Sequence, residues 1–146
     1  MNVLISNFDE LTPRQLHDIF YLRQEVFILE QQCLYPDIDG YDDRATHIAL
    51  YDEQNLAGYL RVFEPGVKFE EAALGRIVVD KSYRGSTIGP SLIKTGIDYC
   101  RTKFPNMGVR IEAQAALLKY YGQFGFKAEG KIYEVDGIDH IQMALN

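Results

Sequence analysis

Apolar residues recur along the chain with two different spacings, one typical of strands and one typical of helices. Residues 77–79 are a β-branched run, Ile-Val-Val, which favours a strand buried on both faces. From residue 88 to residue 104 the apolar positions recur every three or four residues, as on the buried face of an amphipathic helix. The polar residues 80–87 lie between these segments. The pattern therefore predicts a strand, a tight turn and a helix in direct succession.

The same periodicities predict the remaining elements. Thr12-Pro13-x-Gln15 is typical of a capping box with proline at the first helical position, so a helix should run over about residues 13–29. Strands are expected at residues 3–8, 46–51, 56–63, 72–80, 109–114, 126–135 and 140–145, and a short helix at 115–123. The strand at 109–114 should run parallel to the one at 72–80, because a helix connects them.

These elements predict one α/β domain that spans residues 1–146. A chain of this length can bury a full core, and 47% hydrophobic with 25% charged residues is ordinary for a globular protein. We expect a mixed, mostly antiparallel sheet flanked by helices on both faces. Arg23 is the one polar residue on the apolar face of the first helix, and we expect it to reach solvent or pair with a nearby carboxylate.

The net charge narrows the range of partners. Fifteen basic and 21 acidic residues give a formal charge of −6. This argues against a nucleic-acid partner and mildly favours amine ligands, although solubility alone also explains it. The first residues lack a basic segment followed by a long apolar run, and no segment has the length that spans a bilayer. We therefore expect a cytoplasmic protein with no membrane partner.

The cysteines and the acidic residues give no support for a metal site. Cys33 and Cys100 lack the spacing of a metal-binding or redox pair, and Cys100 falls on the apolar face of the helix predicted at 88–104. The acidic loop at residues 30–44 does not fit a calcium-binding EF-hand, since the first and twelfth ligand positions would be Tyr35 and Thr46.

The turn at residues 84–89 has the features of an anion-binding site. A helix N-terminus presents unpaired N–H groups and the positive end of the helix dipole. Two glycines let a diphosphate approach the backbone, and Arg84 can pair with a further phosphate oxygen. The same features also occur in ordinary connections between a strand and a helix, so the turn alone does not decide between the two interpretations.

The turn also resembles a known motif. Val78-Val79-x4-Arg84-Gly85-x2-Ile88-Gly89 is similar to the acyl-CoA signature of the GNAT superfamily of N-acetyltransferases, Arg/Gln-x-x-Gly-x-Gly/Ala. Thr87 stands where that signature has its first glycine. A threonine is tolerated there at negative φ, where its hydroxyl can also bond a phosphate, and is strained at positive φ. CoA affinity therefore depends on the backbone conformation of Thr87.

Two further segments resemble the ElaA-like branch of the same superfamily. The first is Leu22-Arg23-x2-Val26-Phe27-x2-Glu30-Gln31-x-Cys33-x-Tyr35-x3-Asp39-Gly40-x-Asp42, with His47 a few residues on. The second is Ala113-Gln114-x6-Tyr121-x3-Gly125-Phe126, followed by Gly137-Ile138-Asp139-His140-Ile141-x-Met143, in which Asp139 replaces an expected proline. The three matches follow in the family's order and cover most of the chain.

The resemblance implies a fold, a cosubstrate and a reaction. The sheet should be splayed near Val79 and Ala113, with acetyl-CoA in the gap. An acetyl group would pass from acetyl-CoA to an amine of a small molecule or a protein by direct attack, without a covalent acyl-enzyme and without a metal. The implied cofactor-binding residues are Ile77, Val78, Val79, Arg84, Gly85, Ser86, Thr87, Ile88 and Gly89.

The resemblance also implies catalytic roles. Tyr121 matches the family tyrosine that protonates the departing CoA thiolate, and a phenol is protonated at neutral pH. A main-chain N–H at Val79 or a neighbour would stabilise the thioester oxyanion. The candidates for the general base are Glu30, Asp39, Asp42, His47, Glu112 and His140. Of these, His140 and Glu30 join Tyr121 in the predicted catalytic site, and a histidine side chain titrates near neutral pH.

Two other functions stay open at this point. The threonine in the phosphate turn suggests a CoA-binding regulatory module without turnover. Arg23-x3-Phe27 followed by acidic residues resembles the acyl-homoserine-lactone synthases, although the chain is short for that group. The acceptor amine is not defined by the sequence, which is compatible with both a monomer and a homodimer.

Overall fold

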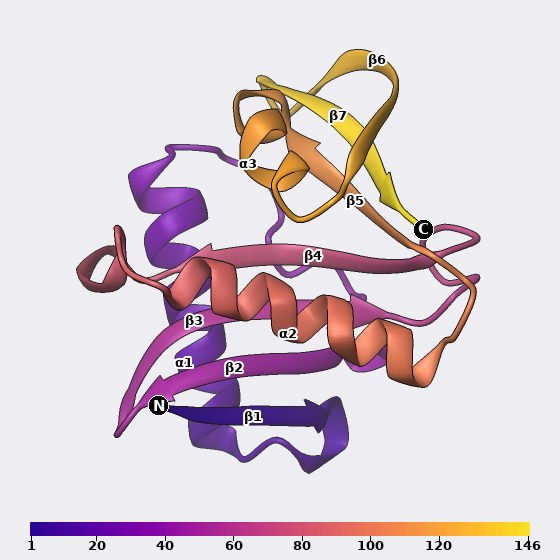
Figure 1. Ribbon diagram of the computed structural model, residues 1–146. Helices are drawn as coiled ribbons and strands as arrows, with labels where there is room; N and C mark the ends of the chain where they lie inside the picture. Colours follow the sequence, from indigo (N-terminus) through magenta and orange to yellow (C-terminus); the bar gives the residue numbers. More distant parts are fainter.

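The computed structural model describes residues 1–146, which form one seven-stranded sheet with helices on both faces (Figure 1). The strand order is β1-β2-β3-β4-β5-β7-β6, and every neighbouring pair is antiparallel except β4 and β5. The strands are β1 Asn2–Asn7, β2 Thr46–Asp52, β3 Asn55–Phe63, β4 Ala72–Val79, β5 Val109–Gln114, β6 Lys127–Val135 and β7 Ile138–Leu145. The predicted mixed, mostly antiparallel α/β fold is confirmed.

Helix α1, Pro13–Arg23, lies on one face of the sheet. The predicted capping box starts it: the Thr12 hydroxyl accepts from the Gln15 N–H at 3.1 Å, and the Gln15 side chain accepts from the Thr12 N–H at 2.9 Å. A π-helical segment, Gln24–Glu30, continues the predicted helix to its expected end. The apolar side chains of both parts pack against β3 and β4.

Helix α2, Ile88–Lys103, covers the opposite face (Figure 1). Its buried face includes Leu92, Ile93 and Ile97, each of which contributes about 1.5–3 kcal/mol by leaving water. Gly96 allows close approach to the sheet, since a Cβ there would lie 3.0 Å from a methyl carbon of Leu60. The predicted core position of Cys100 is also confirmed. The short helix α3, Leu118–Gly122, follows a 3-10 turn at Ala115–Leu117.

The two halves of the sheet separate between β4 and β5. The parallel pairing joins only Ala72–Leu74 to Val109–Ile111. Beyond these residues β4 stays paired with β3, and β5 stays paired with β7, so the two strands diverge (Figure 1). Each strand is thus left with an unpaired edge that faces the other. The predicted splay near Val79 and Ala113 is confirmed.

Arg76 interrupts the regular alternation of β4. Its φ is +49°, in the left-handed region that non-glycine residues rarely adopt, and the register with β3 shifts beside it. The additional residue lets Leu74 and Ile77, three positions apart, both pack under α2. Such a backbone conformation costs on the order of 1–3 kcal/mol, so the surrounding structure must hold it in place.

Candidate active site

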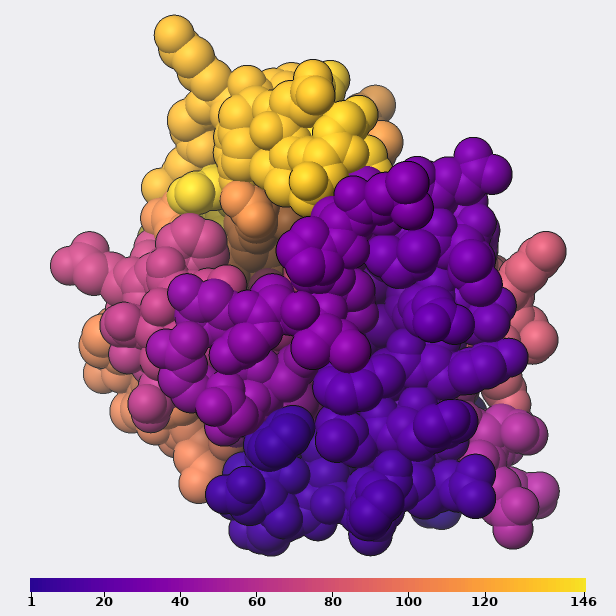
Figure 2. All heavy atoms as spheres, turned by 180° about the vertical axis from the view of Figure 1, so that it is seen from behind, coloured from indigo at the N-terminus to yellow at the C-terminus, as the bar shows by residue number.

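A cavity of about 400 Å³ opens where β4 and β5 diverge, a size typical of small-molecule sites. Its walls come from β3, β4, β5, β7, helix α3, the β6–β7 turn and the loops at residues 31–41 and 68–69. The loop reaches across the gap to the C-terminal half of the sheet (Figure 2). Gln114 Nε2 donates to Gln31 Oε1 at 3.3 Å, and the Cys33 thiol donates to the carbonyl of Asp136 at 3.3 Å.

The turn between β4 and α2 keeps backbone donors unpaired. The N–H groups of Gly85, Ser86, Thr87 and Gly89 donate to no backbone carbonyl. Gly85 has φ +76°, a conformation that glycine adopts without strain. Because these donors lie at the positive end of a 16-residue helix, the turn can hold an anion such as a diphosphate.

Thr87 has φ −82° and ψ 0°, so its β-branched side chain is not strained. Its hydroxyl makes no capping hydrogen bond to the helix, and the residue is exposed. The sequence left both a negative and a positive φ possible at Thr87, and the structure has the negative φ at which threonine is tolerated. The departure from the family glycine therefore leaves a hydroxyl beside the unpaired N–H groups rather than a distorted turn.

Tyr121 lines the cavity from helix α3. The side chain is 7% exposed, and its ring packs edge-on against Phe126, with the ring centroids 6.3 Å apart. Burial, and secondarily the neighbouring Tyr120, raise the pKa of Tyr121, so the phenol stays protonated through the neutral range. This is the state that a proton donor requires.

Tyr120 lies beside the turn between β4 and α2, which the sequence analysis did not predict. A Cβ at Gly89 would lie 2.8 Å from the Tyr120 hydroxyl, so the two residues are in contact across the gap between α2 and α3. The ring of Tyr120 packs between those of Tyr121 and Phe124, at centroid distances of 5.4 Å in each case. Helix α3 thus places Tyr121 in the cavity and the preceding Tyr120 against the turn.

Three of the six candidate bases line the cavity, His140, Glu112 and Asp39, and Asp39 is also part of a network of ion pairs with arginines. His140 Nδ1 lies 2.8 Å from the carbonyl of Ile138. Because a carbonyl can only accept, Nδ1 carries the hydrogen and Nε2 keeps its lone pair. Glu112 accepts a hydrogen bond from the Tyr133 hydroxyl. His140 and Tyr121 are therefore brought to one cavity by β7 and α3, as expected from their motifs.

Glu30 lies elsewhere, paired with Arg84 of the turn between β4 and α2. Arg84 makes two contacts to it: Nη2 donates to Oε1 at 2.7 Å, and Nη1 donates to Oε2. These hydrogen bonds from Arg84 lower the pKa of Glu30, which weakens it as a base. Glu30 is absent from the cavity lining, and its catalytic role stays a prediction.

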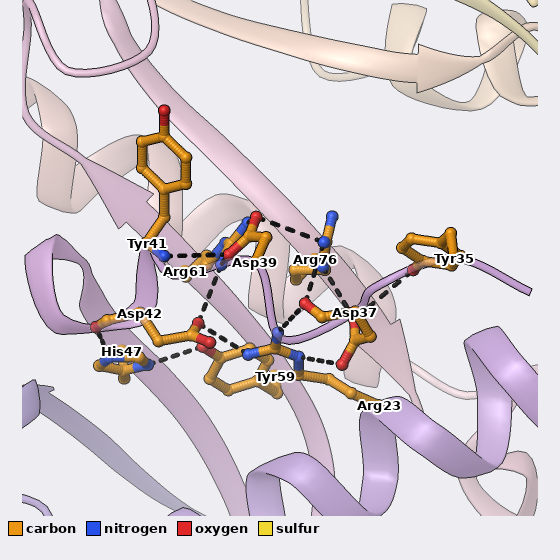
Figure 3. A network of polar contacts seen from close by, with 10 residues as sticks. All are labelled: Arg23, Tyr35, Asp37, Asp39, Tyr41, Asp42, His47, Tyr59, Arg61 and Arg76. Atoms are coloured by element: carbon orange, nitrogen blue, oxygen red, sulfur yellow. Dashed lines mark hydrogen bonds and ion pairs between the residues drawn. The ribbon is translucent and has the colours of Figure 1, made fainter. Parts of the chain in front are cut away.

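Asp39 and the remaining candidate bases belong to a buried polar network (Figure 3). Asp37, Asp39 and Asp42 of the loop alternate with Arg23, Arg61 and Arg76 in a closed ring of six ion pairs, which we call the charge ring. The contacts in order are Arg23–Asp42 2.8 Å, Asp42–Arg61 2.9 Å, Arg61–Asp39 2.6 Å, Asp39–Arg76 3.4 Å, Arg76–Asp37 2.9 Å and Asp37–Arg23 2.9 Å. The expected pairing of Arg23 with a carboxylate is confirmed.

His47 supports this network from β2 and is fully buried. Its Nε2 lies 2.9 Å from the carbonyl of Asp42, so Nε2 carries the hydrogen and Nδ1 accepts from the Tyr59 hydroxyl at 2.6 Å. Burial lowers the pKa of His47, which keeps the ring neutral. Both nitrogens are engaged away from the cavity, so the geometry gives His47 a structural contact rather than a place beside a substrate.

The arrangement of a splayed sheet, a turn with unpaired donors and a tyrosine in the gap agrees with comparisons to known proteins. A family model for the acetyltransferase (GNAT) domain matches residues 9–146. The chain belongs to the GNAT acetyltransferase family. Its relatives in this family include protein ElaA of Escherichia coli, 36% identical over 137 residues that cover 92% of this chain and 90% of ElaA.

Solved structures of GNAT proteins are similar over the whole chain. An acyl-CoA N-acyltransferase from Pseudomonas aeruginosa superposes with a TM-score of 0.94 at 30% identity and covers 100% of both chains. The crystal structure of E. coli ElaA gives a TM-score of 0.92 at 34% identity and covers 99% of both chains. The ElaA-like resemblance of the sequence is confirmed, and this GNAT protein is an acyl-CoA-dependent transferase.

Two negative observations accompany the assignment. None of the helices in this GNAT protein combines the length and the apolar composition that crossing a bilayer requires. No group of three or more His, Cys, Asp or Glu side chains is placed to hold a metal ion.

Sequence reasoning missed Arg76, which lines the cavity from the irregular point of β4. One signal was present: Arg76 is the only charged residue in the otherwise apolar run Ala-Ala-Leu-Gly-Arg-Ile-Val-Val of residues 72–79. A charge in the middle of a buried strand needs a partner, and here that partner is the acidic loop.

Proposed function

We propose that the protein transfers an acetyl group from acetyl-CoA to an amine of a small molecule by direct attack. The main support for the proposal is that the edge of β4, the cavity and the turn before α2 lie in succession. The unpaired edge of β4 runs past the cavity that holds Tyr121 and leads to the turn whose N–H groups are unpaired. A pantetheine arm paired with residues 77–79 would thus connect a diphosphate in the turn to a thioester in the cavity.

In the proposed reaction a C–N bond to the amine replaces the C–S bond of the thioester, and two protons are transferred. The neutral amine nitrogen attacks the thioester carbonyl carbon, a C–N bond forms, and the C–S bond breaks. A main-chain N–H at Val79 or a neighbour stabilises the oxyanion. Tyr121 gives its proton to the departing CoA sulfur, and the proton lost by the amine passes to a base. The products are the N-acetylated amine and CoA as a thiol, and the proton on the base then returns to Tyr121 through solvent, which restores both residues for the next turnover.

His140 is the base that we favour. The Nε2 lone pair is unpaired within the protein because Nδ1–H is fixed on the carbonyl of Ile138. Strand β7 places this ring in the lining of the cavity that also holds Tyr121. Arginine pairs occupy Asp39 and Asp42, and His47 is buried with both nitrogens engaged.

The cofactor contacts would divide between strand and turn. Residues 77–79 supply backbone groups for the pantetheine, and Gly85, Ser86, Thr87 and Gly89 supply N–H donors for the diphosphate. Ile88 is buried in the core and fixes the first turn of α2. Arg84 would pair with a phosphate oxygen once its contact with Glu30 opens.

Replacement of Tyr121 by Phe tests the proposal. We expect kcat for acetyl transfer to fall by on the order of 10²–10⁴, with the acetyl-CoA dissociation constant unchanged, because only the proton donor is lost. Tyr99→Phe is the matched control, since the Tyr99 hydroxyl contacts Thr46 and lies outside the cavity. The assay measures CoA thiol release with amino acids, polyamines and arylalkylamines. Binding of acetyl-CoA without transfer to any amine would instead favour a regulatory module.

A further inference from the structure

Arg76 is the least satisfied member of the charge ring. Arg23 makes three hydrogen bonds to Asp37 and Asp42, and Arg61 makes three to Asp39 and Asp42. Arg76 donates through Nη2 alone, to the Asp37 carbonyl at 3.0 Å and to Asp39 at 3.4 Å. Its Nε lies 2.9 Å from the Asp37 carboxylate without the alignment of a hydrogen bond.

The second terminal nitrogen of Arg76, Nη1, has no partner in the protein. Figure 3 shows one terminal nitrogen of Arg76 without a contact, on the side away from the aspartates. The side chain is 21% exposed, whereas Arg23 and Arg61 are almost completely buried. Since Arg76 belongs to the cavity lining, this exposure opens toward the candidate site.

The surroundings hold this guanidinium in one orientation. The strained backbone at φ +49° directs the side chain out of the strand, and the aspartates fix one edge of the guanidinium. The Tyr35 ring lies 5.3 Å from its central carbon. An arginine fixed in this way has lost its rotamer freedom before a ligand arrives, which favours recognition of an anionic group by the remaining N–H donors.

The rest of the cavity is lined by apolar side chains and by the acidic residues Asp39, Glu112 and Asp136. Phe27, Phe63, Phe69 and Ile138 line it together with Lys68, whose ammonium lies 3.6 Å from the centre of the Tyr41 ring. Lys68 forms no ion pair with a carboxylate. The cavity therefore offers two cationic side chains, Arg76 and Lys68, that keep N–H donors without a hydrogen-bond partner in the protein, next to apolar side chains.

We propose that the acceptor is a small amine that also carries a carboxylate and an apolar group, such as an apolar amino acid, and that Arg76 binds the carboxylate. This inference rests on the proposed acyl transfer to an amine and names its substrate class. Arg76 precedes Ile77, which lies on the strand segment that would pair with the pantetheine. A carboxylate on Arg76 therefore leaves the amine of the same molecule close to the thioester position.

The test compares acceptors that differ only in the carboxylate. L-Phenylalanine and L-leucine are each compared with the corresponding carboxamide, at a saturating acetyl-CoA concentration, and kcat/KM is measured from CoA thiol release. We expect the acids to be preferred by on the order of 10- to 100-fold, as for a charge-assisted hydrogen bond lost from a buried site. The amine of the carboxamide loses its proton more readily, so intrinsic reactivity biases the assay against this result.

Variants then assign the preference to Arg76. Arg76→Gln should reduce the ratio of acid to amide to within about threefold, chiefly through KM of the acid, and Arg76→Lys should restore part of it. Arg101→Gln is the matched control, because Arg101 is exposed on α2 and lies outside the cavity. Calorimetric titration with acetyl-CoA shows which variants remain folded.

The outcomes separate this inference from the proposed function. Efficient transfer to carboxamides or simple amines, without preference for the acids, would overturn the role of Arg76 and leave acyl transfer intact. A preference that persists in a folded Arg76→Gln variant would also overturn it. No thiol release with any amine would overturn both proposals. If Arg76→Gln fails to fold, Arg76→Lys is the variant that decides, and a ratio of acid to amide equal to that of the unaltered protein would overturn the role of Arg76.

Discussion

Arg84 Nη2 lies 2.7 Å from Oε1 of Glu30, so the guanidinium in the turn between β4 and α2 is held by a carboxylate 54 residues earlier in the chain. The pair joins the end of the π-helical segment to the turn that precedes α2. It raises the pKa of Arg84 and lowers that of Glu30, chiefly through the hydrogen bonds between them. A diphosphate in the turn would compete with Glu30 for the same donors.

Glu30→Gln should therefore bind acetyl-CoA about two- to fivefold more tightly, because the carboxylate no longer competes with the diphosphate and an exposed ion pair contributes only weakly. The gain should shrink at high salt, where the charges are screened. Calorimetric titration at two salt concentrations measures it. If instead kcat falls by two orders of magnitude with unchanged affinity, Glu30 acts as the base and the competition between carboxylate and phosphate is not the main effect.

Gly89→Ala should weaken acetyl-CoA binding, since the new Cβ would lie 2.8 Å from the Tyr120 hydroxyl and 3.7 Å from Val79 Cγ2. Either the tyrosine or the turn must move. The double variant Gly89→Ala with Tyr120→Phe removes the atom that obstructs the Cβ, and we expect most of the affinity to return. Titration of the four proteins of this cycle gives the coupling between the two sites. If the effects of the two substitutions on acetyl-CoA affinity are simply additive, the proposed contact between residues 89 and 120 is wrong.

Asp42→Asn should destabilise the protein by about 3–5 kcal/mol, because it leaves two buried arginines without a shared carboxylate. Asp43→Asn is the matched control: Asp43 is adjacent and exposed and should have almost no effect. Urea unfolding of both variants measures the difference in the free energy of unfolding. Equal stability of the two variants would show that the charge ring adds little.

The charge ring also determines how the free energy of unfolding depends on pH in the acidic range. Burial alone would raise the pKa values of Asp39 and Asp42, but their arginine partners outweigh it and lower both below the ordinary value of about 3.9. The stability that a lowered pKa provides is fully present above the unfolded pKa and is lost as pH falls through the folded pKa. The free energy of unfolding should therefore decline below about pH 4, less steeply in Asp42→Asn.

The elements with strong periodicity could be predicted from the sequence. The strand Val109–Gln114 has the expected bounds, because its buried and exposed residues alternate, and the capping box located the start of α1. Arg23 stood out as a polar residue on an apolar face, which correctly indicated a carboxylate partner. The motifs around Tyr121 and His140 likewise named two residues that share one cavity.

Other features depend on tertiary structure and left little trace in the sequence. The splay was expected only from the family resemblance, because periodicity does not show where two parallel strands separate. Arg76 adopts a positive φ that its residue type does not favour. The charge ring joins α1, β3, β4 and an aperiodic loop. Tyr120 was missed because a five-residue helix is too short for the spacing of its apolar residues to show where each side chain points.

Calorimetric titration of the protein with acetyl-CoA and with acetyl-pantetheine, which lacks the phosphates, tests whether the turn before α2 binds the cofactor. We predict measurable binding of acetyl-CoA and a loss of at least tenfold with acetyl-pantetheine. Because Thr87 has φ −82° and an unpaired hydroxyl, Thr87→Gly should leave the affinity unchanged or slightly weaker. Equal affinity for both ligands, no binding of either, or tight binding only after Thr87→Gly would contradict the account.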